Sequence, residues 1–292
     1  MELKILGLSK TYPNGVKALD QVDLTLGKGM FGLLGPNGAG KSSLMRTIAT
    51  LQYPDQGEIE FDGINILTEP LKLRNALGYL PQDFGVYPGI SAEELLSYFA
   101  NLKGMSSGPE RQKLLDYILD VTNLTEVRKR AVSTFSGGMK QRFGIAQLLL
   151  NDPKLIIVDE PTAGLDPAER KRFLNILREI SQNSIVIFST HIVDDVKELC
   201  NDMGIMNAGR ILFRGSPASA TTNLNGKVWQ CNTSRTELAD IEQRYKVISS
   251  GYNEDETVKV RVYSEQQPSH VFNEVKPELE DAYFIKLNGL DL

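Results

Sequence analysis

The chain has few cysteines and histidines and lacks long apolar runs, which argues against a disulfide-rich, a zinc-binding or a membrane-spanning protein. Its 292 residues include two cysteines, two histidines and one tryptophan. Cys200 and Cys231 lie far apart, with no C-x-x-C pair and no metal-ligand spacing, so the sequence favours two reduced thiols over a disulfide framework or a zinc site. An apolar run near the ~18 residues of a membrane span is also missing. We therefore expect a soluble, cytoplasmic protein that reaches a membrane only through a partner.

Charge and composition narrow the class further. The net charge of −5 provides no basic footprint for nucleic acid, so no nucleic-acid partner is expected. Hydrophobic residues at 41% and charged residues at 24% are ordinary globular values. The length suggests two domains.

Patterning along the chain predicts an α/β fold. The first sixty residues alternate apolar with polar side chains between turn signals, which is typical of β structure. Residues 83–150 turn helical, with a Ser91–Glu94 capping box at the start of one helix. From residue 155, strands alternate with helices, which predicts a mostly parallel sheet with helices on its faces. A Ser-, Thr- and Ala-rich stretch at 216–226 is interpreted as a linker, and 227–292 as a small α+β appendage.

The strongest motif is a glycine-rich loop between a predicted strand at 30–34 and a predicted helix at 42–51. It has the form G-x-x-x-x-G-K-[ST], in which backbone N–H groups and a helix N-terminus wrap a polyphosphate. Lys41 is expected to reach the β- and γ-phosphates, and the Ser42 hydroxyl to ligate Mg²⁺. The residues predicted to bind ATP here are Gly35, Pro36, Asn37, Gly38, Ala39, Gly40, Lys41, Ser42 and Ser43.

A second motif, LIIVDE at 155–160, is a buried strand that ends in two carboxylates. Parallel strands present such ends at the edge of the sheet where ligands of α/β folds bind. Asp159 is predicted to hold the metal's water shell, and Glu160 to polarise the attacking water. Taken alone, the pair could equally be a helix cap or a solvated strand end.

Several smaller elements surround these motifs in a fixed order, and together they resemble the nucleotide-binding subunit of ATP-binding cassette (ABC) proteins. The resemblance covers residues 1 to about 215. It rests on the two motifs together with Tyr12, Gln82, Ser136-Gly137-Gly138, 163-AGLDP-167 and His191. It implies a P-loop NTPase with an N-terminal antiparallel β subdomain and an inserted helical subdomain at about 83–150.

The resemblance assigns a role to each of these elements. Tyr12 corresponds to the aromatic residue that stacks on adenine, and Gln82 to the glutamine that touches Mg²⁺. His191 corresponds to the switch histidine. The resemblance thus implies three catalytic residues, Lys41, Glu160 and His191. Ser136, Gly137, Gly138 and Asp166 would reach ATP held by a second subunit.

The signature segment departs from the family's usual pattern at Phe135 and Met139. Phe135 replaces a common leucine and is expected to repack, whereas Met139 replaces a common glutamine for no reason visible in the sequence.

The expected function is that of the Mg-dependent ATPase subunit of an ABC transporter, resembling bacterial drug-resistance exporters. Its expected partners are a second ATPase subunit, identical or paralogous, and a transmembrane permease at the inner face of the membrane. The aromatic-rich segment 83–99 is the expected permease contact. Two alternatives stay open, a non-transport ABC ATPase and a nucleotide-binding module without catalysis. The intact Lys41, Asp159, Glu160 and His191 disfavour the latter.

Overall fold

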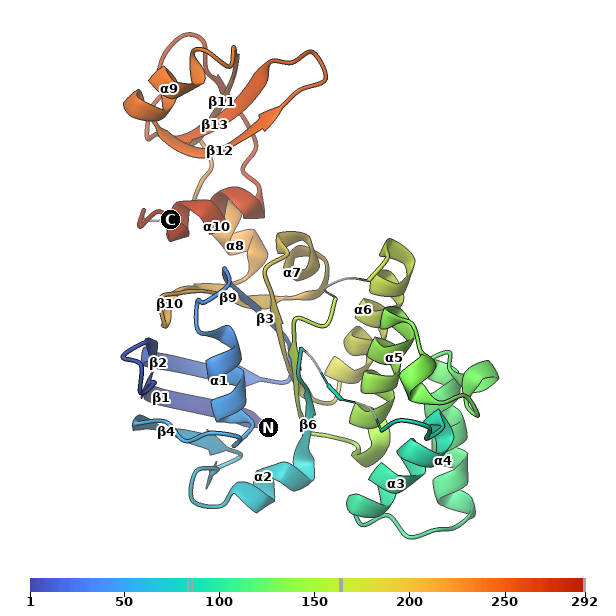
Figure 1. Ribbon diagram of the computed structural model, residues 1–292. Helices are drawn as coiled ribbons and strands as arrows, with labels where there is room; N and C mark the ends of the chain where they lie inside the picture. Colours follow the sequence, from blue (N-terminus) through green and yellow to red (C-terminus); the bar gives the residue numbers. More distant parts are fainter. Residues whose placement is uncertain (83, 86, 163–164, 291–292) are drawn as a thin grey trace. The chain divides into compact units, whose positions relative to one another are not determined.

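The computed structural model describes residues 1–82, 84–85, 87–162 and 165–290 (Figure 1). The chain divides into two compact units, Met1–Ile211 and Leu212–Leu292. The division falls inside strand β10 (Arg210–Gly215), a few residues before the domain boundary predicted from composition. Each unit is considered by itself below.

The first unit begins with an antiparallel sheet, as the alternating pattern predicts. Its strands run in the order β2-β1-β4-β5. Leu3 and Ile5 of the first strand are fully buried, because alternate side chains of a strand face one side of the sheet. Leu8 is also fully buried, because an irregularity in the pairing with β2 between Ile5 and Leu8 changes the alternation. The strands are β1 (Glu2–Thr11), β2 (Lys17–Gly27), β4 (Gln56–Phe61) and β5 (Ile64–Asn65).

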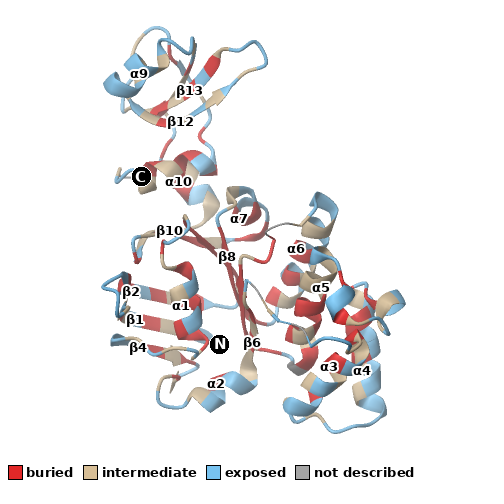
Figure 2. Cartoon of the chain, viewed as in Figure 1, coloured by how far each residue is buried: buried red, intermediate tan, exposed pale blue. Residues whose placement is uncertain are grey.

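The second sheet of this unit has six strands in the order β10-β9-β3-β8-β7-β6. From β9 to β6 every neighbouring pair is parallel, which confirms the predicted parallel sheet. All residues of β7 and β8 are buried, as expected of strands covered on both faces (Figure 2). The remaining bounds are β3 (Gly29–Leu34), β6 (Leu77–Leu80), β7 (Leu155–Asp159), β8 (Ile185–Thr190) and β9 (Asp202–Asn207).

Helices cover both faces of this sheet. Helix α1 (Lys41–Ile48) shares one hydrophobic core with the antiparallel sheet and with strands β3, β7 and β8. Helices α6 (Pro167–Ser181) and α7 (Val193–Leu199) pack against β3 and β8. The short helix α2 (Pro70–Ala76), which the sequence analysis did not predict, leads directly into β6.

The helical segment forms a separate apolar cluster within the first unit. It comprises α3 (Ala92–Leu102), α4 (Pro109–Val121) and α5 (Gly137–Leu148). The predicted capping box is present, since Ser91 and Glu94 each accept a hydrogen bond from the other's backbone N–H. Three short 3-10 turns join these helices to one another and to β7: Thr125–Val127, Val132–Thr134 and Leu149–Asn151.

The second unit has its own sheet, in the order β12-β13-β11-β14, and a core around Val260 and Phe272. The linker interpretation of 216–226 is wrong, because the segment contains helix α8. Ser216 caps that helix and Pro217 occupies its first turn, a start signal that the small-residue composition had obscured. The elements are α8 (Pro217–Thr222), β11 (Val228–Thr233), α9 (Leu238–Arg244), β12 (Lys246–Tyr252), β13 (Val258–Tyr263), β14 (Asn273–Glu274) and α10 (Leu279–Leu287).

Across the described ranges, none of the helices is both long enough and apolar enough to cross a membrane.

Candidate nucleotide-binding site

The two main motifs meet because their strands, β3 and β7, lie on either side of β8 in one parallel sheet. Leu34 at the end of β3 is in register with Thr190 at the end of β8, and Ser189 is in register with Asp159 of β7. The glycine-rich loop, Glu160 and His191 therefore emerge together at the carboxyl edge of the sheet. Gln82 follows β6, the next strand, and is exposed in a bend. This edge is where α/β folds place their ligands.

The glycines of the loop are required by its backbone path. Gly38 and Gly40 have φ angles of +81° and +106°, a region that side chains with a Cβ rarely adopt. A Cβ on Gly35 would lie 2.4 Å from the carbonyl oxygen of Met206, and one on Gly40 would lie 2.3 Å from that of Ala18. Backbone conformation and close packing thus both exclude larger residues, and the loop begins α1 with its N–H groups directed outward at the helix start.

Lys41 lies at the centre of the site, with 4% of its side chain exposed. Its ammonium donates to the carbonyl oxygens of Gly35 (2.7 Å) and Pro36 (3.1 Å), inside the curve of the loop. The same nitrogen is 3.2 Å from Oε1 of Glu160. A buried ammonium needs such partners, and this one is positioned where a phosphate held by the loop would also meet it.

Glu160 connects the loop to His191, the predicted switch histidine. Its second carboxylate oxygen lies 3.3 Å from Nδ1 of His191, so Lys41, Glu160 and His191 form one continuous polar array. Glu160 has a φ of +46°, which is uncommon for a residue with a side chain. The conformation is supported by Ser189, whose Oγ accepts from the Glu160 N–H at 3.0 Å.

Asp159 is buried beside this array and is hydrogen-bonded to the neighbouring strand. The Ser189 hydroxyl donates to its Oδ1 at 2.6 Å. Burial, followed by the negative charge of Asp159, raises the pKa of Tyr79 on the adjacent strand β6. Ser189 thus contacts both members of the carboxylate pair, and sequence reasoning missed it. Its place at the end of the strand next to LIIVDE was the available signal.

Ser42 lies in the first turn of α1, and Tyr12 contacts the residue that follows it. Ser42 is exposed on the first turn, whereas Ser43 is partly covered. The Tyr12 hydroxyl lies 3.1 Å from Oγ of Ser43 and donates to Oε1 of Gln52 at 3.1 Å, which holds the ring beside the helix. The roles assigned to these residues, adenine stacking for Tyr12 and metal ligation for Ser42, stay predictions.

The residues predicted to act in trans lie at two helix starts, outside the array. Ser136 caps α5 by accepting from the N–H of Met139 at 3.3 Å, and both Ser136 and Gly137 are exposed. Asp166 caps α6 by accepting from the N–H of Glu169 at 2.9 Å. Within the predicted AGLDP motif, Ala163 and Gly164 lie outside the described residues.

The structure accounts for both departures in the signature segment. Phe135 is buried and its ring meets that of Phe143 edge to face, at a centroid distance of 6.4 Å. Met139 is partly buried and packs against the same helical core. An apolar side chain at position 139 therefore adds to the packing of the helical segment.

The oxygen donors at this edge fit a nucleotide-bound Mg²⁺. That ion keeps several waters and takes one or two protein ligands beside phosphate oxygens, and Asp159 and Ser42 supply one carboxylate and one hydroxyl. In the part of the chain that the structure describes, no group of three His, Cys, Asp or Glu residues could hold a metal by itself. The donor set therefore suits a metal shared with a phosphate better than an all-protein metal site.

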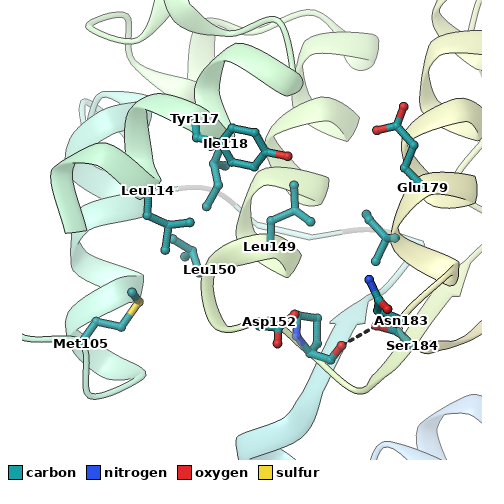
Figure 3. Close-up of a pocket in the computed structure, with 12 residues that line it drawn as sticks. Met105, Leu114, Tyr117, Ile118, Leu149, Leu150, Asp152, Glu179, Asn183 and Ser184 are labelled. Atoms are coloured by element: carbon teal, nitrogen blue, oxygen red, sulfur yellow. Dashed lines mark hydrogen bonds between the residues drawn. The ribbon is translucent and has the colours of Figure 1, made fainter. Parts of the chain in front are cut away.

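A separate pocket of about 470 Å³ lies at the opposite edge of the sheet (Figure 3). It is lined by Pro153 and Ser184, which precede β7 and β8, and by apolar residues of the helical segment such as Leu114 and Ile118. Ser184 Oγ donates to the Pro153 carbonyl at 2.6 Å. The pocket is therefore not part of the nucleotide site.

A glycine-rich loop, a buried lysine and a strand-end carboxylate pair on a parallel sheet define a P-loop nucleotide hydrolase. Comparison with known proteins narrows this class. The ABC transporter family matches residues 19–163. The ABC transporter ATP-binding protein NatA of Bacillus subtilis (strain 168) is 34% identical over 69% of this chain and 82% of NatA. The daunorubicin/doxorubicin resistance ATP-binding protein DrrA of Streptomyces peucetius is 33% identical over 82% of this chain and 71% of DrrA.

Another relative is longer than this chain. The probable multidrug ABC transporter ATP-binding protein YbhF of Escherichia coli (strain K12) is 31% identical over 97% of this chain, which spans 51% of YbhF. Among solved structures, the ATP-binding subunit of an ABC transporter has a TM-score of 0.70 and 29% identity, over 77% of this chain and 93% of that one. A dimeric post-hydrolysis state of the cassette MJ0796, bound to ADP and Pi, has a TM-score of 0.68 and 27% identity, over 73% of this chain and 98% of that one.

The chain belongs to the ATP-binding proteins of the ABC transporter family. The resemblance inferred from the motifs and the P-loop fold are both confirmed.

Proposed function

We propose that this protein is the ATPase subunit of an ABC exporter, in which two ATPase subunits close on ATP and drive a separate transmembrane permease. The observation that carries the proposal is the continuous array of Lys41, Glu160 and His191 at the mouth of the glycine-rich loop. The drug-resistance names of YbhF and DrrA support export as the direction. With such a permease the protein would lie at the inner face of the membrane.

The residues of the array divide the work of hydrolysis. Lys41 neutralises phosphate charge from inside the loop, and Glu160 orients and deprotonates the attacking water. His191 holds the second oxygen of Glu160 and so fixes the direction of the carboxylate. Ser42 and Asp159, with Gln82, would hold Mg²⁺, which supplies positive charge to the β- and γ-phosphate oxygens.

The second half of each site is proposed to come from another subunit. Ser136, Gly137 and Gly138 form a helix start with a hydroxyl and few side-chain atoms, and its first two residues are exposed, which suits close approach to a phosphate. Phosphates held by the glycine-rich loop already have Lys41 and the loop's own N–H groups as partners in the same chain. This second anion site therefore serves ATP held by a neighbouring subunit. The dimeric cassette structures of MJ0796 support such an arrangement.

The proposed permease contact lies at the start of the helical segment. Tyr87 and Tyr98 are 55% and 48% exposed, and their rings meet edge to face at 6.5 Å. Phe84 and Phe99, in contrast, pack against the helical core. Asp83 and Val86 of the predicted segment lie outside the described residues. The exposed tyrosine pair is thus the part of this segment available to anchor a partner.

The decisive variant is Glu160→Gln, which preserves the shape of the side chain and removes the base. We expect ATP turnover to fall by about 10² to 10⁴, the usual contribution of general acid–base catalysis. ATP binding should persist, and ATP should shift the variant from monomer to dimer in size-exclusion chromatography. Glu179→Gln, on the exposed side of α6 at the opposite edge of the sheet, is the matched control and should retain turnover. Full activity of Glu160→Gln would reject the proposal.

A further inference from the structure

A buried carboxylate outside the array joins two parts of the catalytic edge. Asp195 lies in the first turn of α7, four residues after His191, and is fully buried. The Thr162 hydroxyl donates to its Oδ2 at 2.7 Å, and Nε of Arg170 donates to its Oδ1 at 2.6 Å. Burial of a carboxylate is costly unless it is paired and hydrogen-bonded. The position of α7 is therefore tied to both of these donors.

The two donors flank the segment that begins at Glu160. Thr162 follows Glu160 by two residues, and Arg170 lies in the first turn of α6, one turn after its cap Asp166. The N–H of Arg170 donates to the Asp166 carbonyl at 2.9 Å, so the backbone of Arg170 and the cap belong to the same helical turn. Asp195 thereby contacts both Thr162, which closely follows the catalytic glutamate, and Arg170 at the start of α6.

The residue before Arg170 makes a second connection in another direction. Oε2 of Glu169 lies 3.0 Å from Nε of Arg142 on α5, the helix that begins at the Ser136 signature. Arg142 also donates to the carbonyl of Asn123 at 2.6 Å. A Cβ on Gly138 would lie 3.3 Å from Cγ of Glu169, so the absence of a side chain there permits the close approach of the two helices.

We propose that Glu169 and Arg170 are positioning residues that make the start of α6 a common anchor for the two halves of the ATPase site. Consecutive helical residues point about 100° apart. Arg170 therefore points toward α7, where it contacts Asp195, whereas Glu169 points toward α5, where it contacts Arg142. The first connection sets the geometry of Glu160 and His191. The second sets where Ser136 stands relative to Asp166 when a partner subunit closes. The inference rests on the proposed function, since it concerns the alignment of that same site.

The first connection is tested at Thr162 with two substitutions that separate hydrogen bonding from packing. Thr162→Val keeps the shape and removes the hydroxyl, whereas Thr162→Ser keeps the hydroxyl and removes a buried methyl group. We expect Thr162→Val to lower kcat by about tenfold to a hundredfold, the range that a misplacement of about 1 Å costs, with little change in KM for ATP. Thr162→Ser should retain kcat close to the wild type.

A control variant tests the same pair of helices away from the site. Arg178 of α6 donates to the carbonyl of Glu198 in α7 at 2.7 Å, near the other ends of the two helices. Arg178→Ala removes a contact between α6 and α7 without touching Asp195, so it should leave kcat unchanged even if the melting temperature falls. If kcat falls equally in Thr162→Val, Thr162→Ser and Arg178→Ala, the contacts are merely structural and the first connection is rejected.

The second connection is tested by dimerisation in the full-length Glu160→Gln background. Adding Glu169→Gln should leave ATP affinity of the monomer unchanged and weaken the ATP-driven dimer by about tenfold, because the largely buried ion pair that holds α6 against α5 is lost. An unaltered dimer dissociation constant would overturn this part. The outcome is distinguishable from failure of the proposed function, in which the wild type would not hydrolyse ATP or Glu160→Gln would retain full turnover.

Discussion

Gly40→Ala is the substitution for which the structure predicts the most specific consequence. Gly40 is the residue before Lys41, at the start of α1, and its carbonyl accepts from the N–H of Leu44 at 2.9 Å. Its φ of +106° is unfavourable for alanine, and the added Cβ would lie 2.3 Å from the backbone oxygen of Ala18 and 2.8 Å from Cε of Met206. The methionine end can move, whereas the strand carbonyl of Ala18 cannot do so without shifting β2.

The expected loss of stability has two parts. A positive φ costs a residue with a Cβ about 1–2 kcal/mol, and overpacking of a tight interior adds about 1–3 kcal/mol. Together they lower the free energy of unfolding by about 2–5 kcal/mol. Gly15→Ala is the matched control, because Gly15 has a φ of +83° but no atom within 4 Å of the added Cβ. It should therefore show the conformational part alone, about 1–2 kcal/mol.

Urea denaturation of the two variants and the wild type measures these differences directly. ATP affinity, measured by calorimetry, should fall about tenfold or more in Gly40→Ala, because a displaced loop loses at least one charged hydrogen bond worth about 1.5–3 kcal/mol. Gly15→Ala should bind ATP like the wild type. Equal destabilisation of the two variants would show that the close approach to Ala18 does not exist, and the account of the loop would be wrong.

Two further predictions concern the thiols and the second unit. Burial, followed by the charges of Asp195 and Asp202, raises the pKa of Cys200 to about 12, so iodoacetamide should leave it unmodified in the folded protein at pH 8 and label it in urea. Because the folded state holds this proton more tightly than the unfolded state, the free energy of unfolding should fall as pH rises from about 9 to about 12. The Cys200→Ala variant should lack this fall. Labelling of Cys200 in the folded wild type at pH 8 would contradict its burial. Deletion of residues 217–292 keeps β10 whole, together with the core around α1 and the core of the helical segment. Circular dichroism should therefore show a folded protein, and calorimetry an unchanged ATP affinity. An unfolded product would show that the second unit is needed for folding.

Much of the site could be predicted because its chemistry is local in the chain. A glycine loop with Lys41, or a strand that ends in Asp159 and Glu160, brings its functional groups together within a few residues. The parallel alternation of strands and helices then predicts that such segments meet at one edge of the sheet, and the registers of β3, β7 and β8 confirm it. Predictions based on composition alone were weaker. The small-residue stretch at 216–226 folds as α8, and strands β12 and β14 had no clear pattern.

The sequence by itself therefore determined the family and the fold class of the protein, since these follow from short motifs in a fixed order and from the period of the apolar pattern. The roles of the individual site residues stay predictions. The tertiary structure decided how those residues are held. Asp195 and Thr162 are 33 positions apart, and Arg142 and Glu169 come from two helices separated by a buried strand. Ordinary polar residues of this kind carry no signal in the sequence, because only folding removes them from water and makes their pairing necessary.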